Sequence, residues 1–321
     1  MKKKQLKPLN KMWTKEGRDL GETPWAEYPR PAMRRNSFFC LNGGWDFAVK
    51  KANESLVYEG KIIVPFPPES LLSGVDQVFD EGVTLVYKKK FPLAAEMQGG
   101  RILLHFGAVD QTAKVFLNGA LVCQHVGGYT PFSMDVTPHL QEENELVVEV
   151  KDELSKEILP YGKQCRKRGG MWYTPVSGIW QTVWMEKVPH RYIKSVNADV
   201  VGSFVKISIE GVEKAEVIVT TPNGELFFQT EKGVLEFSLE APVFWSPENP
   251  YLYTYRVKTE EDEVESYFAL RTLTIENVLG KPRLCLNGKP YFFHGLLDQG
   301  YFSDGIFTPA TPKRTQKRLR A

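Results

Sequence analysis

Short stretches of alternating apolar and polar residues, separated by turn residues, limit most strongly how this chain can fold. In residues 113–125, AKVFL is followed by Asn118-Gly119 and then by ALVCQH. Asn and Gly tolerate the positive φ angles of a type I′ turn, so this segment predicts a two-residue β-hairpin. The same Asn-Gly pair recurs at 223–224 and 287–288. Further strands are expected at 101–106, 145–150, 181–186, 206–209, 235–239 and 252–258.

No apolar stretch keeps a helical period over three turns, so the chain before Arg283 is predicted to be mainly β. Residues 35–188 are long enough for two sheets, as in a jelly-roll β-sandwich. Residues 189–276 carry short strands at a spacing that suits an immunoglobulin-like β-sandwich. Val188-Pro189 is the expected boundary, because proline resists continuing a strand. Residues 1–34 are predicted to form an N-terminal arm, since their basic start has no apolar run like that of an export signal.

Charge and composition exclude several classes of partner. The chain has 41 basic and 39 acidic residues, a balance that favours neither nucleic acid nor an anionic membrane as partner. No stretch approaches the ~20 apolar residues that span a bilayer. The four cysteines form no CxxC pair, so they are predicted to be reduced thiols in a cytoplasmic protein.

The sequence shows no recognisable catalytic or cofactor motif. No Ser-His-Asp arrangement, metal-ligand spacing or phosphate-binding loop is visible, so we assign no catalytic residue, no metal and no cofactor. The five histidines are scattered, and His105 lies in an apolar strand, where we expect a core residue with its hydrogen bonds satisfied.

Aromatic residues are densest in the segment 168–186, RGGMWYTPVSGIWQTVWME. Exposed aromatic rings stack on the apolar faces of sugars, so this composition favours a carbohydrate site. Trp180 and Trp184 lie four apart on an alternating strand and are expected to share one buried face. Trp172 follows Gly169-Gly170 in a loop and is the candidate carbohydrate contact. The Gly-rich loop 127–135 is interpreted as a rigid turn between two strands.

Taken in order, several segments resemble glycoside hydrolase family 2, the β-galactosidase and β-glucuronidase family. The resemblance covers about residues 35–309 and implies a jelly roll, an immunoglobulin-like sandwich and a (β/α)8 barrel. It also implies hydrolysis of terminal β-linked sugars by a retaining mechanism. The motifs that carry it are LNGGWDF (41–47), VP (64–65) with ES (69–70), FGAVD (106–110), VFLNG (115–119), HVGGYTPF (125–132), SGIW (177–180), FWSPENPYLY (244–253) and LNGKP (286–290) with HG (294–295).

Residues 277–310 resemble the first strand and loop of the family's catalytic barrel, here a truncated TIM barrel. Asp298 and Gln299 follow the apolar run 291–297, and barrel enzymes place polar working groups at the C-terminal ends of their strands. These two residues are therefore predicted, with Trp172, to bind substrate; a solvated loop is the alternative interpretation. Residues 311–321 form a basic tail, with five basic residues and no acidic one.

The sequence departs from the family in two places. Some β-galactosidases carry a sugar-contacting aspartate just before the Met-Trp of the loop, where this chain has Gly170, so the sugar specificity stays open. A barrel needs ~250 residues, far more than the segment 277–321 supplies. A retaining hydrolase needs two carboxylates, which in this family are glutamates from later barrel strands. We therefore expect an N-terminal fragment that is inactive alone.

The expected partner is a carbohydrate, together with a barrel-bearing chain or a second copy of this chain in a homo-oligomer. A non-catalytic carbohydrate-binding protein and a scaffold protein are the alternatives. Without barrel neighbours, the strand 290–297 is expected to expose apolar side chains. Deleting everything after Glu276 is therefore predicted to improve solubility without lowering the melting temperature.

Overall fold

The computed structural model describes residues 12–153, 160–166 and 169–313. The chain divides into two compact units. The first comprises residues 1–29, 38–187 and 299–321, and the second comprises 30–37 and 188–298. Residues 1–11 of the predicted N-terminal arm and residues 314–321 of the basic tail lie outside the described residues.

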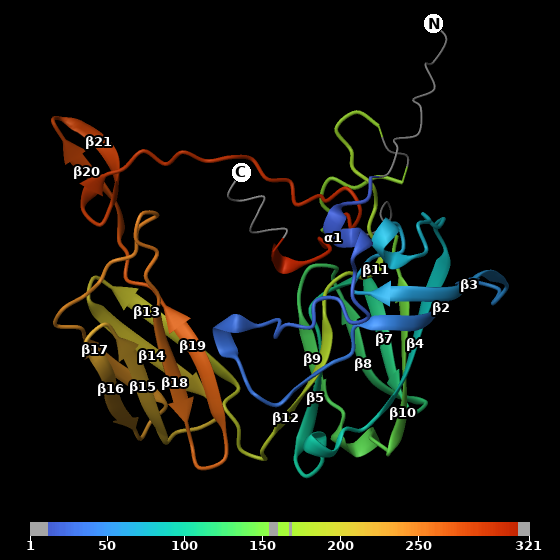
Figure 1. The fold of residues 1–321 in the computed structure, drawn as a ribbon, viewed down its shortest axis with the longest axis horizontal. Helices are drawn as coiled ribbons and strands as arrows, with labels where there is room; N and C mark the ends of the chain where they lie inside the picture. Colours follow the sequence, from blue (N-terminus) through green and yellow to red (C-terminus); the bar gives the residue numbers. More distant parts are fainter. Residues whose placement is uncertain (1–11, 154–159, 167–168, 314–321) are drawn as a thin grey trace, which may run out of the picture. The chain divides into compact units, whose positions relative to one another are not determined.

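The first unit is a β-sandwich of antiparallel strands (Figure 1). Its sheets have the strand orders β3-β2-β4-β10-β7-β8, β1-β12-β5-β9 and β11-β6. The strands are β1 Phe38–Cys40, β2 Gly43–Lys51, β3 Leu56–Val64, β4 Val83–Pro92, β5 Arg101–Phe106, β6 Val109–Asp110, β7 Thr112–Leu117, β8 Ala120–Val126, β9 Phe132–Asp135, β10 Glu143–Lys151, β11 Gly178–Ile179 and β12 Val183–Val188.

Alternation of side chains along the strands builds the core of this unit. In β10, Leu146, Val148 and Val150 are buried while the residues between them are not. Successive side chains of a strand point to opposite faces, so such a strand contributes every second residue to the core. The core cluster also contains Trp45, Phe47 and Tyr87 from the large sheet, with Leu104 and Met185 from the four-stranded sheet.

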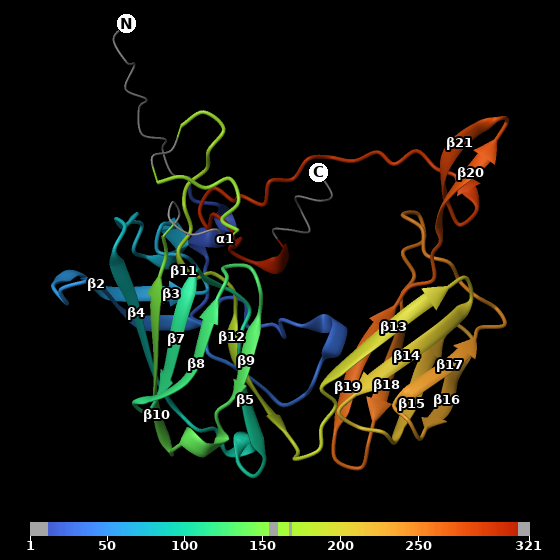
Figure 2. The ribbon, with the colours of Figure 1, turned by 180° about the vertical axis from the view of Figure 1, so that it is seen from behind.

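The second unit carries a three-stranded sheet of order β13-β14-β17 and a four-stranded sheet of order β16-β15-β18-β19, seen from behind in Figure 2. Its core cluster includes Val217, Tyr253, Tyr255 and Val257. A further antiparallel sheet, β20-β21-β22, follows in the sequence. The strands are β13 Ser195–Val201, β14 Phe204–Glu210, β15 Ala215–Thr221, β16 Gly224–Thr230, β17 Val234–Ser238, β18 Tyr253–Lys258, β19 Glu263–Phe268, β20 Leu273–Val278, β21 Lys281–Leu286 and β22 Lys289–Pro290.

Residues 30–37 are held in the second unit by a buried ion pair. The Arg35 guanidinium donates to both carboxylate oxygens of Asp262, at 3.1 and 2.9 Å, and both side chains are buried. Asp262 also accepts from the backbone amide of Ile193 at 2.8 Å. A two-point contact of this kind fixes orientation as well as distance.

Helix is scarce in the described part of the chain. Among the described residues are the short α-helix α1 Lys15–Arg18 and the 3-10 helices η1 Pro31–Met33, η2 Leu71–Ser73, η3 Ala95–Met97 and η4 Thr137–His139. Among the described residues, no helix has both the length and the apolar character needed to cross a membrane. The prediction of a mainly β chain is confirmed.

Two of the three predicted Asn-Gly turns form as expected. Asn118 and Gly119 have φ angles of 51° and 83°, and Asn287 and Gly288 have 52° and 73°. The hairpin at 223–224 also forms, but its register pairs Thr221 with Gly224, so the turn is centred one residue earlier than predicted.

The predicted start of a barrel is not seen among the described residues. The hairpin at 287–288 forms, but β22 ends at Pro290, and residues 291–298 belong to no strand. Phe292, Leu296 and Leu297 are 86%, 91% and 86% exposed. A barrel strand is held by hydrogen bonds to neighbouring strands on both sides, and no described segment supplies such neighbours.

Candidate functional site

Five aromatic rings gather on the first unit and form what we call the aromatic patch. Tyr129 lies in the loop between β8 and β9, and Tyr301 and Phe307 come from the C-terminal segment. Tyr173 lies in the loop before β11, and Trp180 follows β11 directly. Trp180 meets Phe307 edge-on at 5.2 Å between centroids and Tyr129 at 6.0 Å. Tyr173 stacks on Tyr301 at 4.2 Å, and Tyr301 lies 5.1 Å from Phe307. All five rings retain some exposure, which leaves apolar surface beside phenol hydroxyls.

Backbone and side-chain hydrogen bonds hold the patch in place. The Trp180 indole donates to the carbonyl oxygen of Gly128 at 2.8 Å. The amide of Gln164 donates to the Tyr129 hydroxyl at 2.8 Å and accepts from the backbone amide of Val176 at 2.6 Å. Trp180 and Tyr129 are therefore anchored through their polar groups, so the apolar faces of these two rings are presented in fixed directions.

The carboxyl group of Asp110 is buried against the loop that carries Tyr129. Asp110 is fully buried, and a Cβ atom at Gly128 would lie 2.2 Å from its Oδ1, so only glycine lets the loop pass. Burial and the nearby charge of Asp152 raise the pKa of Asp110 to about 8, although the Gln164 amide opposes the rise. Neither oxygen makes a hydrogen bond of good geometry to a described residue. This carboxyl is thus held largely neutral at pH 7.

Two further acids lie buried in the same unit. Burial raises the pKa of Asp152 to about 6, while the positive charge of Arg166 opposes the rise. Burial also raises the pKa of Glu69 to about 8, although Ser177 donates to its carboxyl from Oγ at 2.5 Å and from its backbone amide at 3.2 Å. Burial disfavours the charged form of a carboxyl, which is why the pKa values of both acids are raised.

The three predicted substrate-binding residues do not all belong to one unit. Trp172 is 38% exposed in the loop just before Tyr173 of the aromatic patch. Gln299 is partly buried and begins the C-terminal segment of the first unit, whereas the exposed Asp298 ends the second unit. Because β22 ends at Pro290, neither Asp298 nor Gln299 follows a strand directly. Their role in binding stays a prediction.

The two tryptophans expected to share a buried face differ in the structure. Trp184 on β12 is 5% exposed and stacks on His105 at 4.8 Å. Trp180 follows β11, outside any strand, and joins the aromatic patch instead. The prediction was therefore right for Trp184 and wrong for Trp180, because the turn 180–182 interrupts the alternation on which it rested. His105 is buried as expected, with Nε2 3.1 Å from a carboxylate oxygen of Glu186.

Sequence reasoning missed Asp110, Asp152 and Gln164 as site residues. Asp110 lies within a motif already noted for its family resemblance, FGAVD, but its burial depends on a loop that arrives from residues 127–131. The sequence did carry one signal for Asp110: it is an acidic residue among the apolar residues of a predicted strand region, where an acid is expected to have a special role. Within the described ranges, no group of three or more His, Cys, Asp or Glu side chains is placed to hold a metal ion.

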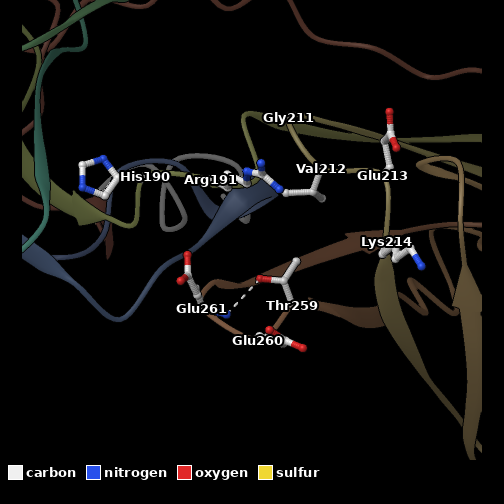
Figure 3. Close-up of a pocket in the computed structure, with 9 residues that line it drawn as sticks. All are labelled: His190, Arg191, Gly211, Val212, Glu213, Lys214, Thr259, Glu260 and Glu261. Atoms are coloured by element: carbon white, nitrogen blue, oxygen red, sulfur yellow. Dashed lines mark hydrogen bonds between the residues drawn. The ribbon is translucent and has the colours of Figure 1, made fainter.

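A hollow of about 1100 Å³ lies on the second unit (Figure 3). Its side chains carry both signs of charge and do not converge on a common point (Figure 3). Their one drawn contact is a 3.3 Å hydrogen bond from the backbone amide of Glu261 to Thr259 Oγ1. This hollow lacks the focused polar groups of a ligand site. It is lined by His190, Arg191, Gly211, Val212, Glu213, Lys214, Thr259, Glu260 and Glu261.

Comparison with known proteins places both units in one family. Residues 51–174 match the model described as glycosyl hydrolase 2 galactose-binding domain-like, and residues 193–271 match the model of glycosyl hydrolases family 2. The first match defines a sugar-binding-like β-sandwich, and the second defines the immunoglobulin-like domain of the same enzymes. The chain belongs to glycoside hydrolase family 2, of which it carries the N-terminal domains.

Individual relatives agree with this assignment. A β-galactosidase of Thermoanaerobacter pseudethanolicus is 27% identical over 257 residues, covering 72% of this chain and 33% of that protein. A β-glucuronidase of Streptococcus agalactiae is 24% identical over 300 residues, covering 84% of this chain and 48% of the relative. A solved β-glucuronidase of Faecalibacterium prausnitzii shares the fold, with a TM-score of 0.71 at 24% identity, over 92% of this chain and 55% of that one. The chain spans about half or less of the length of these relatives.

Proposed function

We propose that the first unit binds a terminal β-linked sugar and that the chain acts as the N-terminal part of a retaining glycoside hydrolase. The observation that carries the proposal is the aromatic patch of the galactose-binding-like domain, with the buried carboxyl of Asp110 beneath its loop. Sugars are recognised by aromatic faces combined with a few fixed polar groups.

Each polar group of the site has a part in this proposal. The exposed indole of Trp172 stacks on the sugar ring, and the hydroxyls of Tyr129 and Tyr301 exchange hydrogen bonds with sugar hydroxyls. Gln299, which belongs to the same unit, contributes a further polar contact. Asp110 is fully buried and touches no sugar; it packs beneath the loop at Gly128 and supports the loop that carries Tyr129.

Residues 277–310 are proposed to correspond to the first strand and loop of the family's catalytic barrel. The exposed apolar side chains of Leu284, Phe292 and Leu296 favour this assignment, since barrel neighbours would cover them. The same side chains favour a barrel-bearing partner chain, the scaffold alternative, in which the barrel is supplied separately.

We further propose that residues 1–321 alone do not cleave glycosides. A retaining mechanism needs two carboxylates ~5–5.5 Å apart, one as nucleophile and one as acid/base. The family takes both from barrel strands later than the segment to which residues 277–310 correspond. Carbohydrate binding without cleavage is therefore the expected behaviour of this polypeptide.

Titration and turnover assays test the two parts separately. Methyl β-D-galactoside and methyl β-D-glucuronide are titrated into the protein while tryptophan fluorescence or saturation-transfer NMR reports binding. We expect a dissociation constant in the millimolar range or tighter for at least one sugar, and weakening in Trp172→Ala. No response up to 50 mM of either sugar would refute sugar binding, whereas release of p-nitrophenol from the matching chromogenic glycosides above a buffer blank would refute inactivity.

A further inference from the structure

Residues 302–310 form a compact buried segment of the first unit, which we call the strap. Phe302 and Ile306 exchange backbone hydrogen bonds of 2.7 and 3.1 Å, and the backbone amide of Thr308 donates to the carbonyl of Gly305 at 3.2 Å. Asp304, Gly305 and Ile306 are buried, as are Thr308 to Ala310. The strap therefore has its own turn structure and packs as part of the sandwich.

Asp304 fastens one end of the strap to two distant parts of the unit. Its side chain is 1% exposed, and Oδ2 accepts from the backbone amide of Thr14 at 2.9 Å and from Thr14 Oγ1 at 2.5 Å. Its carbonyl oxygen accepts from the backbone amide of Leu72 at 3.1 Å. A buried carboxylate oxygen that accepts two hydrogen bonds strongly restricts the backbone that carries it.

The other end of the strap is tied to the aromatic patch. Thr308 Oγ1 donates to the backbone carbonyl of Trp180, and the indole of Trp25 donates to the carbonyl of Pro309 at 2.7 Å. Phe307, between these anchors, lies edge-on to Trp180 at 5.2 Å. Tyr301, just before the strap, contacts Phe307 at 5.1 Å and stacks on Tyr173.

Two of the five rings of the aromatic patch therefore depend on the strap: Phe307 lies in it, and Tyr301 directly precedes it. We propose that Asp304 is a positioning residue for sugar binding: by fixing the strap to Thr14 and Leu72, it sets the places of Tyr301 and Phe307 on the patch. This inference rests on the proposed sugar binding by the first unit. Asp304 itself is buried and touches no sugar; it acts through the rings that the strap carries.

The decisive variant is Asp304→Asn, which keeps the size of the side chain but removes its charge and one acceptor oxygen. Asp80→Asn is the matched control, because Asp80 is exposed in the same unit. Methyl β-D-galactoside and methyl β-D-glucuronide are titrated at 25 °C, after circular dichroism shows that both variants are folded. We expect the dissociation constant to rise about tenfold in Asp304→Asn and to stay within twofold of the original in Asp80→Asn.

A merely structural role predicts a different pattern. It would lower the melting temperature of Asp304→Asn and leave the dissociation constant unchanged at a temperature where the protein is folded, and that result overturns the proposal. Positioning also requires that the effect become smaller in a Phe307→Ala background, where only Tyr301 is left to be positioned. Should Asp304→Asn fail to fold, Thr14→Val keeps the backbone donor to Asp304 and removes the hydroxyl donor, together with the bond that this hydroxyl accepts from the Gly17 amide. We expect this variant to weaken binding about threefold; unchanged binding overturns the proposal too.

The role of Asp304 in positioning the rings can still be tested if the unmodified protein binds neither sugar. That result refutes the proposed sugar binding, and the placement of the rings is then read from hydrogen exchange and near-UV circular dichroism. We expect the amides of Phe302 and Thr308 to exchange at least tenfold faster in Asp304→Asn, with a changed aromatic signal. Unchanged exchange and an unchanged aromatic spectrum would show that Asp304 does not position the patch.

Discussion

Residues 291–298 and the strap, 302–310, are almost adjacent in the chain but have opposite environments. Leu296 is 91% exposed, whereas Ile306 is 8% exposed. The first segment is the richer in large apolar side chains, YFFHGLLD against FSDGIFTPA. Whether a segment is buried therefore depends on its tertiary contacts more than on its own hydrophobicity. The strap is hydrogen-bonded to Thr14, Trp25 and Leu72, whereas residues 291–298 form no strand among the described residues.

This comparison reverses one expectation from the sequence. The whole region after Glu276 was predicted to be removable without a loss of melting temperature. The strap is instead buried, and Ala310 packs with Phe66 and Leu72 in a small core cluster. The expected exposure of apolar side chains holds for residues 291–298, but it does not extend to 302–310.

The largest effect is expected from removing residues 299–321. This deletion takes away the hydrogen bonds of Asp304 and uncovers Phe66 and Leu72, so we expect the first unit to lose about 3 kcal/mol or more of unfolding free energy. Differential scanning calorimetry should show a lower transition for this unit. An unchanged transition would mean that the strap contributes nothing to the fold.

Two glycines give a matched test of the difference. A Cβ atom at Gly305 would lie 1.8 Å from the carbonyl oxygen of Thr308, whereas a Cβ at Gly295 would meet nothing within 4 Å. Gly305→Ala should cost about 2–4 kcal/mol, and Gly295→Ala should change stability by no more than ~0.5 kcal/mol. Chemical denaturation of both variants measures the contrast, and equal effects would contradict the two environments described.

The buried acids of the first unit predict a dependence of stability on pH. The pKa values of Glu69 and Asp110 are about 8 in the folded protein, above those of unfolded carboxyls, so the folded state binds more protons between pH 4 and 8. Their contribution to stability is fully present below pH 4 and is lost as the pH rises through about 8.

Thermal midpoints measured at steps between pH 5 and pH 9 test whether stability falls as the pH rises. The midpoint of the first unit should fall by several degrees over that range, and Asp110→Asn should flatten the fall. The control is Asp298→Asn, an exposed position in the other unit, which should leave the profile unchanged. A midpoint that rises with pH would show that these carboxyls are charged in the folded protein.

The smallest effect on stability is expected from the double variant Leu296→Ser and Leu297→Ser. Both side chains are exposed, so unfolding free energy should change by no more than ~0.5 kcal/mol while solubility increases. Static light scattering at rising protein concentration measures the second effect. Ile306→Ser, the buried counterpart on the strap, should instead cost about 2 kcal/mol or more.

Local patterns in the sequence predicted most of the fold. The strand 101–106 and the turns at Asn118-Gly119 and Asn287-Gly288 depend on neighbouring residues, and the structure has them as expected. The class of fold and the family resemblance followed from such segments taken in order. Periodicity succeeded for Trp184 because that residue lies inside a continuous strand, β12.

The candidate site was harder to predict because its contacts join distant parts of the sequence. Asp304 meets Thr14 at a separation of 290 residues, and no local pattern indicates that pairing. Trp180 lies outside the predicted strand because the chain turns between β11 and β12. Asp110 is buried because the loop at Gly128 covers it. Each of these outcomes depends on tertiary packing, which short-range alternation does not encode.

The contact between Asp304 and Thr14 also has a consequence for the order in which the protein is made. Both segments of the second unit, residues 30–37 and 188–298, are translated between the two halves of this contact. The immunoglobulin-like unit can therefore fold on the ribosome while the first unit still awaits its last piece. The sandwich that begins near the N-terminus becomes complete only when residues 299–310 have emerged, so the first unit to start is the last to finish.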